Sequence, residues 1–140
     1  MIYEMKLASL PFEKIASGRK TMELRLFDEK RRKIDIGDII IFTSIAEPMQ
    51  KIAVTVKSLH RYATFEDMFM DIPLKLCGND STDTPKKAAA KMIEYYTDAQ
   101  VQLYGVLGIG IALVDTETAL KQLEEKKEAE FERLFPDGMK

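Results

Sequence analysis

Residues 39–63, which read IIIFTSIAEPMQKIAVTVKSLHRYA, decide the fold of this protein. The segment 39–44 is almost wholly apolar, which is typical of a strand buried on both faces. Residues 51–63 alternate apolar and polar positions, and their length predicts a strand with a bend or bulge near Ser58. The two strands follow each other without a helical crossover. This argues against a doubly wound parallel sheet and for a mixed sheet or small barrel.

The segments around this pair complete an α+β pattern. Gly108 and Gly110 interrupt the last apolar segment and would allow close packing or a bend there. Further strands are expected at 2–9, 21–27 and 106–114, and helices at 9–20, 64–72, 85–104 and 115–135. The order predicts a small barrel-like sheet, mixed but mostly antiparallel, with helices at its periphery.

Composition and charge suit a single folded domain. The chain has 140 residues, of which 46% are hydrophobic, and its formal net charge is -2. Residues 1–62 hold 12 Lys and Arg against 8 Asp and Glu, whereas the remaining residues are net acidic. Such a polarised surface can steer an anionic ligand even though the average charge is close to zero.

Several classes of protein are excluded or disfavoured. Cys77 is the only cysteine, so no intramolecular disulfide is possible, and with His60 as the only histidine a structural zinc site is excluded. The glycines of residues 104–111 have the wrong order for a dinucleotide fingerprint, and no phosphate-binding loop is present. These observations leave room for a carboxylate-bound ion such as magnesium, but no ligand spacing argues for one, so we expect no metal and no cofactor. No segment has the pattern of a signal peptide or a membrane span, so a cytoplasmic location without a membrane partner is expected.

Residues 17–26, SGRKTMELRL, hold the main candidate site at a helix-to-strand junction. Thr21, Glu23 and Arg25 share one strand face at intervals of roughly 6.5–7 Å. Lys20 has the other parity, but it lies at the junction, where parity is not yet fixed. The group is either a solvated ion pair worth at most about 1 kcal/mol or a cluster at the mouth of a pocket.

Two other segments carry groups suited to nucleic acid. The basic run in residues 28–33, DEKRRK, suits phosphate contacts, but two acidic residues precede the cations and a solvated loop is the favoured interpretation. His60, Arg61 and Tyr62 combine cationic and stacking groups, which suits a base, but the end of a strand followed by a capped helix is the favoured interpretation.

The sequence as a whole resembles a known family. Residues 18–25, GRKTMELR, match the G-x-K-x-x-E-x-R signature of the ASCH domain, a member of the PUA-like superfamily, at Gly18, Lys20, Glu23 and Arg25. Residues 11–42 are similar to the N-terminal half of stand-alone bacterial ASCH proteins. The resemblance covers about residues 2–114, which implies an ASCH domain over 1–114 and a C-terminal helical extension over 115–140.

The resemblance implies a fold and a function. The fold is a small PUA-like β-barrel, closed or nearly closed, with flanking helices, to which this chain adds a C-terminal helix. The implied function is binding of RNA or a nucleotide in a cleft lined by Lys20, Glu23 and Arg25. We also expect Arg61 and Tyr62 to contact the ligand.

The family also offers an enzymatic alternative. One bacterial branch is an amidohydrolase that removes the acetyl group of acetylcytidine with a lysine, a threonine nucleophile and a glutamate, and ribonuclease activity has been proposed for other members. Lys20 matches the lysine, but Glu23 stands at the position of the threonine, so Thr21 would have to be the nucleophile. Glu66 is a guess for the glutamate of that branch. If the protein is an enzyme, Lys20, Thr21 and Glu23 are its candidate catalytic residues.

The C-terminal helix has an apolar stripe on an otherwise charged surface. The stripe consists of Leu120, Leu123, Phe131 and Leu134. It packs either on the barrel of its own chain or on a second copy, which makes a homodimer possible.

Overall fold

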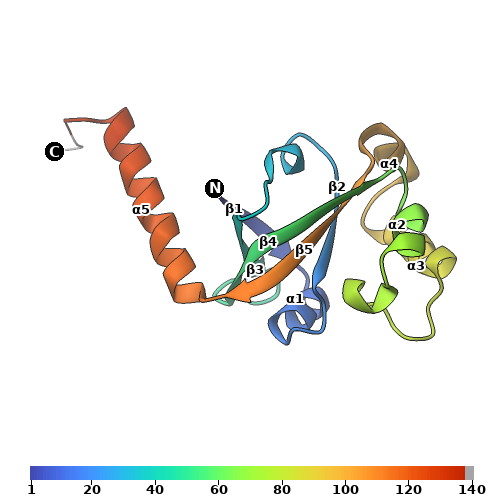
Figure 1. Cartoon of the computed structure of the whole chain (residues 1–140). Helices are drawn as coiled ribbons and strands as arrows, with labels where there is room; N and C mark the ends of the chain where they lie inside the picture. The colour runs from blue at the N-terminus through green and yellow to red at the C-terminus, as the bar shows by residue number, and fades with distance from the viewer. Residues whose placement is uncertain (138–140) are drawn as a thin grey trace.

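The computed structural model describes residues 1–137 and contains a five-stranded sheet in the order β1-β3-β4-β5-β2 (Figure 1). Strand β1 runs parallel to β3, and every other neighbouring pair is antiparallel. The predicted α+β fold with a mixed, mostly antiparallel sheet is therefore confirmed. The strands are β1 (Ile2–Leu7), β2 (Met22–Leu26), β3 (Ile39–Ser44), β4 (Lys51–Tyr62) and β5 (Val106–Val114). The helices are α1 (Ser9–Ala16), α2 (Phe65–Asp71), α3 (Pro85–Lys91), α4 (Asp98–Tyr104) and α5 (Thr116–Leu134), with short 3-10 turns η1 (Arg31–Lys33), η2 (Leu74–Cys77) and η3 (Met92–Glu94).

Strand β3 is buried on both faces, as its apolar sequence predicts. Ile40, Ile41 and Phe42 are each at most 1% exposed. Ile40 and Phe42 belong to the main core, which α1 covers, whereas Ile41 faces the start of α5. Covering both faces removes the apolar surface of the strand from water, which is the main stabilising contribution to such a sheet.

A bulge in β4 curls the sheet. The register between β4 and β5 shifts between Val56 and Ser58, which confirms the irregularity predicted near Ser58. Gly110 lies opposite Ser58, and a Cβ atom at Gly110 would be 2.0 Å from Ser58 Oγ. Because a bulge increases local twist, the sheet closes into a half-barrel with β1 and β2 at its two edges (Figure 1).

A second core lies behind β2. Met22, Leu24 and Leu26 pack against α2, which supplies Phe65 and Met68 among other apolar residues. Helix α2 begins where predicted, because the Thr64 hydroxyl accepts a hydrogen bond from the Asp67 N–H at 3.1 Å.

The prediction of one helix over residues 85–104 is wrong. Helix α3 ends at Lys91, and α4 starts again at Asp98 after the turn η3. The Thr97 hydroxyl accepts the Gln100 N–H while the Gln100 side chain accepts the Thr97 N–H, a capping box that begins a new helix. The break leaves Tyr95 and Tyr96 outside regular helix, where they can face the sheet.

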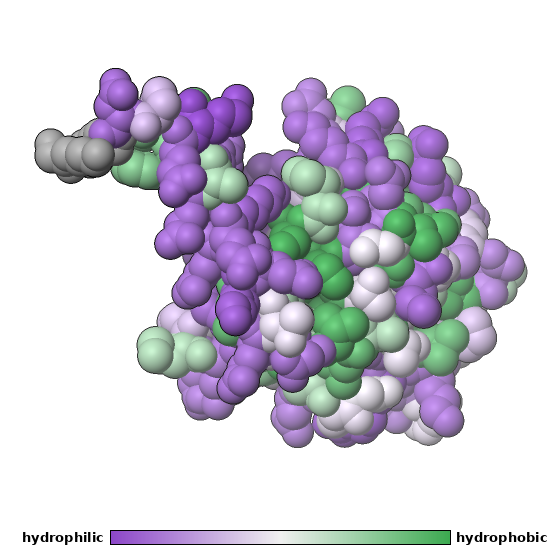
Figure 2. Space-filling view, turned by 60° about the vertical axis from the view of Figure 1, so that its left-hand side comes forward, coloured by the Kyte–Doolittle hydropathy of each residue, from purple (hydrophilic) through white to green (hydrophobic). Residues whose placement is uncertain are grey.

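Helix α5 buries apolar side chains against the sheet only at its beginning, and further along Lys127 forms an ion pair with Glu4 of β1 at 3.5 Å. Ala119 and Leu123 are buried against Ile41 and Ala53. The rest of the helix projects away from the domain (Figure 1), and Figure 2 shows it as a mostly hydrophilic rod beside an apolar surface. Whether residues 115–140 form a separate extension stays a prediction, and residues 138–140 lie outside the described residues. None of the described helices is long and apolar enough to cross a membrane.

The bulge generates the first prediction. Gly110→Ala should lower the free energy of unfolding by about 1–3 kcal/mol in urea denaturation, because the new methyl group overlaps Ser58 Oγ. Gly108→Ala serves as the control with a smaller loss, since its Cβ would meet only side-chain ends of Ile72 and Met22 at 3.3 Å. Ser58→Gly should recover part of the stability that Gly110→Ala removes; equal losses with and without Ser58 would contradict this account.

Candidate functional site

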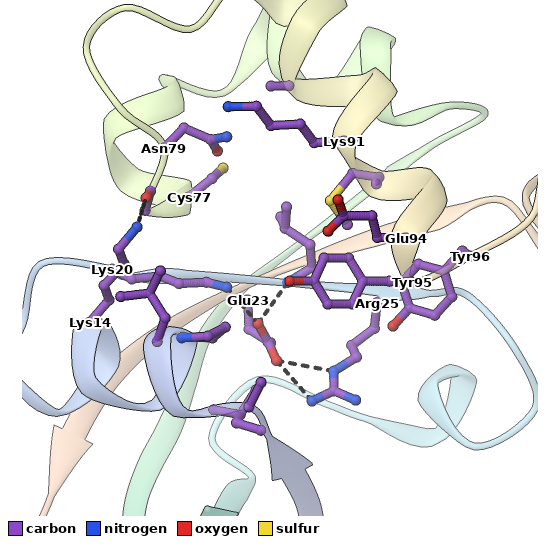
Figure 3. Close-up of a pocket in the computed structure, with 18 of the residues that line it drawn as sticks. Lys14, Lys20, Glu23, Arg25, Cys77, Asn79, Lys91, Glu94, Tyr95 and Tyr96 are labelled. Carbon is purple, nitrogen blue, oxygen red and sulfur yellow. Dashed lines mark hydrogen bonds and ion pairs between the residues drawn. The ribbon is translucent and has the colours of Figure 1, made fainter. Parts of the chain in front are cut away.

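A buried carboxylate lies at the centre of the site. Glu23 is 2% exposed, and its Oε1 is 2.9 Å from Lys20 Nζ (Figure 3). Its Oε2 accepts from Arg25 Nε at 3.0 Å and lies 2.9 Å from Arg25 Nη2. The backbone N–H of Leu24 donates to Oε1 at 3.2 Å. Four donors therefore occupy the two oxygens, which is about the full acceptor capacity of a carboxylate.

The charge of Glu23 is stabilised by its two partners. Burial by itself raises the pKa of this carboxyl, but the charges and hydrogen bonds of Lys20 and Arg25 more than offset that effect and hold the pKa below the 4.5 of a free glutamate. Glu23 is thus ionised at neutral pH. The predicted group is a buried cluster and not an exposed ion pair.

The turn after α1 brings Lys20 to Glu23. Gly18 adopts the left-handed conformation, with φ of 79°, that ends many helices. The Lys20 N–H then donates to the Lys14 carbonyl at 3.0 Å, which fixes the chain just before β2. In a regular strand, the side chains of Lys20 and Glu23 would point to different faces. Lys20 lies in the turn before β2, so this alternation does not determine where its side chain points.

Arg25 connects the two edges of the half-barrel. Within residues 1–137, β1 and β2 do not pair through their backbones. The guanidinium of Arg25 in β2 donates from Nη2 to the carbonyl of Lys6 in β1 at 3.0 Å. One side chain therefore anchors Glu23 and also bridges the open side of the sheet.

A pocket of about 540 Å³ lies over this cluster (Figure 3). Its walls come from α1, the end of β1, the residues after η2 and the segment from α3 to Tyr96. Two carboxylates, Glu23 and Glu94, face five cations in its lining: Lys6, Lys14, Lys20, Arg25 and Lys91. The pocket is thus positively charged although the chain carries a net charge of -2.

Two tyrosines form the wall opposite the lysines. Tyr96 stacks on Phe65 with ring centroids 5.9 Å apart, and burial raises the pKa of its hydroxyl. Tyr95 is 58% exposed, and Figure 3 shows its ring reaching over the pocket. The sequence prediction missed both residues. The signal that could have found them is the capping pattern of Thr97 and Gln100, which marks the break in the helix.

The catalytic candidates are only partly brought together. Lys20 and Glu23 line the pocket, but Thr21 does not appear among its lining residues. Glu66 is exposed on the first turn of α2 and also lies outside the pocket lining. A catalytic role for Thr21 or Glu66 stays a prediction.

The expected ligand contacts Arg61 and Tyr62 also lie outside the pocket lining. The guanidinium of Arg61 lies over the ring of Phe27, 4.0 Å from its centroid. The hydroxyl of Tyr62 donates to the Asp71 carboxylate, and this hydrogen bond, together with burial, raises the pKa of Tyr62 to about 12. Their roles as ligand contacts stay predictions.

Other reactive groups near the pocket offer little for covalent chemistry. Burial raises the pKa of the Cys77 thiol to about 11, although Lys20 acts in the opposite direction. The thiol is therefore protonated at neutral pH, and a thiol is a poor nucleophile compared with a thiolate. Within residues 1–137, no group of three or more His, Cys, Asp or Glu side chains could hold a metal ion.

The curled five-stranded sheet with this signature at its open edge defines a PUA-like domain. The sequence model of the ASCH domain matches residues 5–132, so the chain belongs to the ASCH domain family. The crystal structure of the hypothetical protein PH0355 is similar, with 32% identity, a TM-score of 0.72, and coverage of 81% of this chain and 100% of that one. The solution structure of protein PF0455 from Pyrococcus furiosus has 27% identity, a TM-score of 0.63, and coverage of 82% and 99%. A search among curated proteins finds no match.

The buried cluster generates a pH-dependent prediction. Glu23→Gln should lower the free energy of unfolding at pH 7 by about 3–5 kcal/mol, because it leaves Lys20 and Arg25 as poorly compensated buried cations. The folded-state pKa of Glu23 lies below the unfolded value, so its contribution is complete above pH 4.5 and is lost as the pH falls below that value. The stability gap between wild type and variant should therefore narrow on acidification.

The exposed pair of Arg19 and Glu13, 3.4 Å apart, supplies the control. Glu13→Gln should change the stability by no more than about 0.5 kcal/mol at any of these pH values. A Glu23→Gln loss as small as that of the control would show that the buried cluster contributes little.

Proposed function

We propose that the pocket binds RNA or a free nucleotide, with one nucleotide unit held over Lys20 and Arg25. The observation that carries this proposal is the buried Glu23 carboxylate, which fixes two cations on the floor of a positively charged cavity. Membership of the ASCH family, whose PUA-like fold is of the RNA-binding kind, supports the same ligand class.

In this proposal Glu23 positions other groups and does not itself contact the ligand. Its oxygens are already occupied by Lys20, Arg25 and a backbone N–H. The ammonium of Lys20 has three donors and the guanidinium of Arg25 has five, so both retain N–H groups that their protein partners do not use. These donors suit a phosphate or a base carbonyl, which bind charged donors strongly.

Size and aromatic character support a nucleotide. A volume of about 540 Å³ falls within the range of roughly 300–1,000 Å³ that is usual for small-molecule sites. The exposed ring of Tyr95 is available for stacking on a base. Lys6 and Lys14 at the rim, on β1 and α1, add positive charge for the phosphate.

The hydrolase alternative has weaker support. Thr21, the nucleophile that it requires, is not among the pocket-lining residues, and the Cys77 thiol is held in its protonated form by burial. A chromatographic assay with acetylcytidine and with a labelled RNA tests it directly. If the wild-type protein turns over either substrate and Lys20→Ala abolishes this activity, the hydrolase alternative is favoured over binding alone.

Binding is tested with a charge-matched pair of variants. Lys20→Met removes a cation from the pocket floor, whereas Arg19→Met removes an exposed cation one residue away. In calorimetric titrations with a nucleoside 5′-monophosphate and with a short RNA, Lys20→Met should weaken binding at least about tenfold, the value of one charge-assisted contact. Arg19→Met should leave the affinity within about twofold. No saturable binding by wild type, or equal binding by both variants, would rule the proposal out.

A second copy of the chain is the proposed partner of α5. Phe131 and Leu134 are 45% and 59% exposed on its projecting half, where the ring of Phe135 packs on that of Phe131 with centroids 4.9 Å apart. Light scattering should give the mass of a dimer, and Phe131→Ala with Leu134→Ala should give that of one chain. A wild-type mass of one chain at high concentration contradicts the dimer.

A further inference from the structure

Two guanidinium groups share one aromatic ring beside the pocket. Arg32 and Arg61 lie over the ring of Phe27, 4.8 Å and 4.0 Å from its centroid. Both arginines are exposed, and no carboxylate within residues 1–137 forms an ion pair with either of them. A cation–π contact orients each guanidinium, but it does not neutralise the repulsion between two like charges held so close together.

The neighbouring Arg31 has a donor without a partner. Its Nη1 donates to the Asp28 carboxylate at 2.9 Å. Its Nε is buried and has no hydrogen-bond partner in the described part of the chain. A buried donor left unpaired costs about 1–3 kcal/mol. Because this atom has almost no accessible surface, it contributes no contact to a ligand in this structure.

The arginine cluster adjoins the pocket through strand β2. Phe27 follows Glu23 and Arg25 at the same strand parity, about 7 Å beyond Arg25 along the chain. The Phe27 N–H donates to the Gly105 carbonyl at 3.0 Å, which keeps the chain extended beside β5 at this point. The arginines on Phe27 therefore begin about one pair of strand residues beyond Arg25, on the strand face that carries the floor of the pocket.

We propose that Arg32 and Arg61, held on Phe27, form a second contact point that binds the nucleotides adjacent to the one in the pocket. The ligand is then single-stranded nucleic acid of several nucleotides and not a mononucleotide. The guanidinium planes suit both phosphate oxygens and the faces of unstacked bases. This inference rests on the proposed function of the pocket and specifies its ligand class.

The dependence of affinity on the length of the ligand distinguishes the second contact point from the pocket. Affinities are measured for uridine 5′-monophosphate and for oligouridylates of two, three and four nucleotides. The proteins are wild type, the double variant Arg32→Met/Arg61→Met, and the charge-matched control Arg19→Met/Arg133→Met, whose arginines are exposed elsewhere. Thermal unfolding shows that each variant is folded before it is titrated.

For wild type, we expect the affinity to rise at least about tenfold from one to four nucleotides. The double variant should lose most of this rise while it binds the mononucleotide within about twofold of wild type. The control should keep the rise. The slope of log K against log salt for the tetranucleotide should fall by about 1.4 in the double variant, since each phosphate contact on a single strand contributes about 0.7.

The possible failures are distinguishable. An affinity independent of length, or a double variant that keeps the rise, overturns the second contact point and leaves the pocket proposal intact. Loss of mononucleotide binding in a folded double variant also overturns it, because the arginines would then belong to the pocket itself. If Lys20→Met leaves the binding of all lengths unchanged and only the arginine variant weakens it, the second contact point stands and the proposed function of the pocket fails.

Discussion

The buried ion cluster of Glu23 with Lys20 and Arg25 is the interaction on which the rest of the site depends. A carboxylate that is 2% exposed can stay ionised only when nearby cations offset the loss of hydration. Lys20 belongs to the turn after α1, whereas Arg25 also reaches the carbonyl of Lys6 in β1. The same charges thus connect a turn and both edge strands, and they hold two cations on the floor of the pocket.

The surrounding fold makes this arrangement possible in two ways. The bulge at Ser58, opposite Gly110, curls the sheet so that β1 and β2 approach each other closely enough for one side chain to bridge them. The helical path of residues 85–104 stops after η3 and starts again only at the capping box of Thr97, so Tyr95 and Tyr96 line the pocket instead of lying along a helix. Both features are departures from regular secondary structure, and both shape the pocket.

The distribution of charge over the fold matches the proposed ligand. The net charge of the chain is -2, yet four of the 12 cations in residues 1–62 line the pocket and two more lie on Phe27. Helix α5, which projects on the side of the sheet away from α2, α3 and α4 (Figure 1), carries six acidic and four basic residues, and residues 63–115 carry eight acidic and four basic ones. Local clustering of cations of this kind raises the concentration of an anionic ligand at the site without making the whole protein basic.

The sequence by itself determined the class of fold and the signature residues. The apolar run of β3 and the alternation of β4 report local backbone geometry, so they predicted adjacent strands, a mixed sheet and the bulge near Ser58. Glu23 and Arg25 share a strand face for the same reason, and the G-x-K-x-x-E-x-R pattern pointed to the ASCH family, which the match over residues 5–132 confirms.

Only the tertiary structure decided what these residues contact. Strand parity does not extend into the turn that carries Lys20, so its approach to Glu23 depends on how the end of α1 joins β2. The bond from Arg25 to Lys6 and the stacking of Arg61 on Phe27 join residues far apart in the sequence. Such contacts are set by the curl of the sheet and by side-chain packing, which periodic sequence patterns do not encode. They bring the signature residues together in a charged pocket with a second arginine cluster beside it.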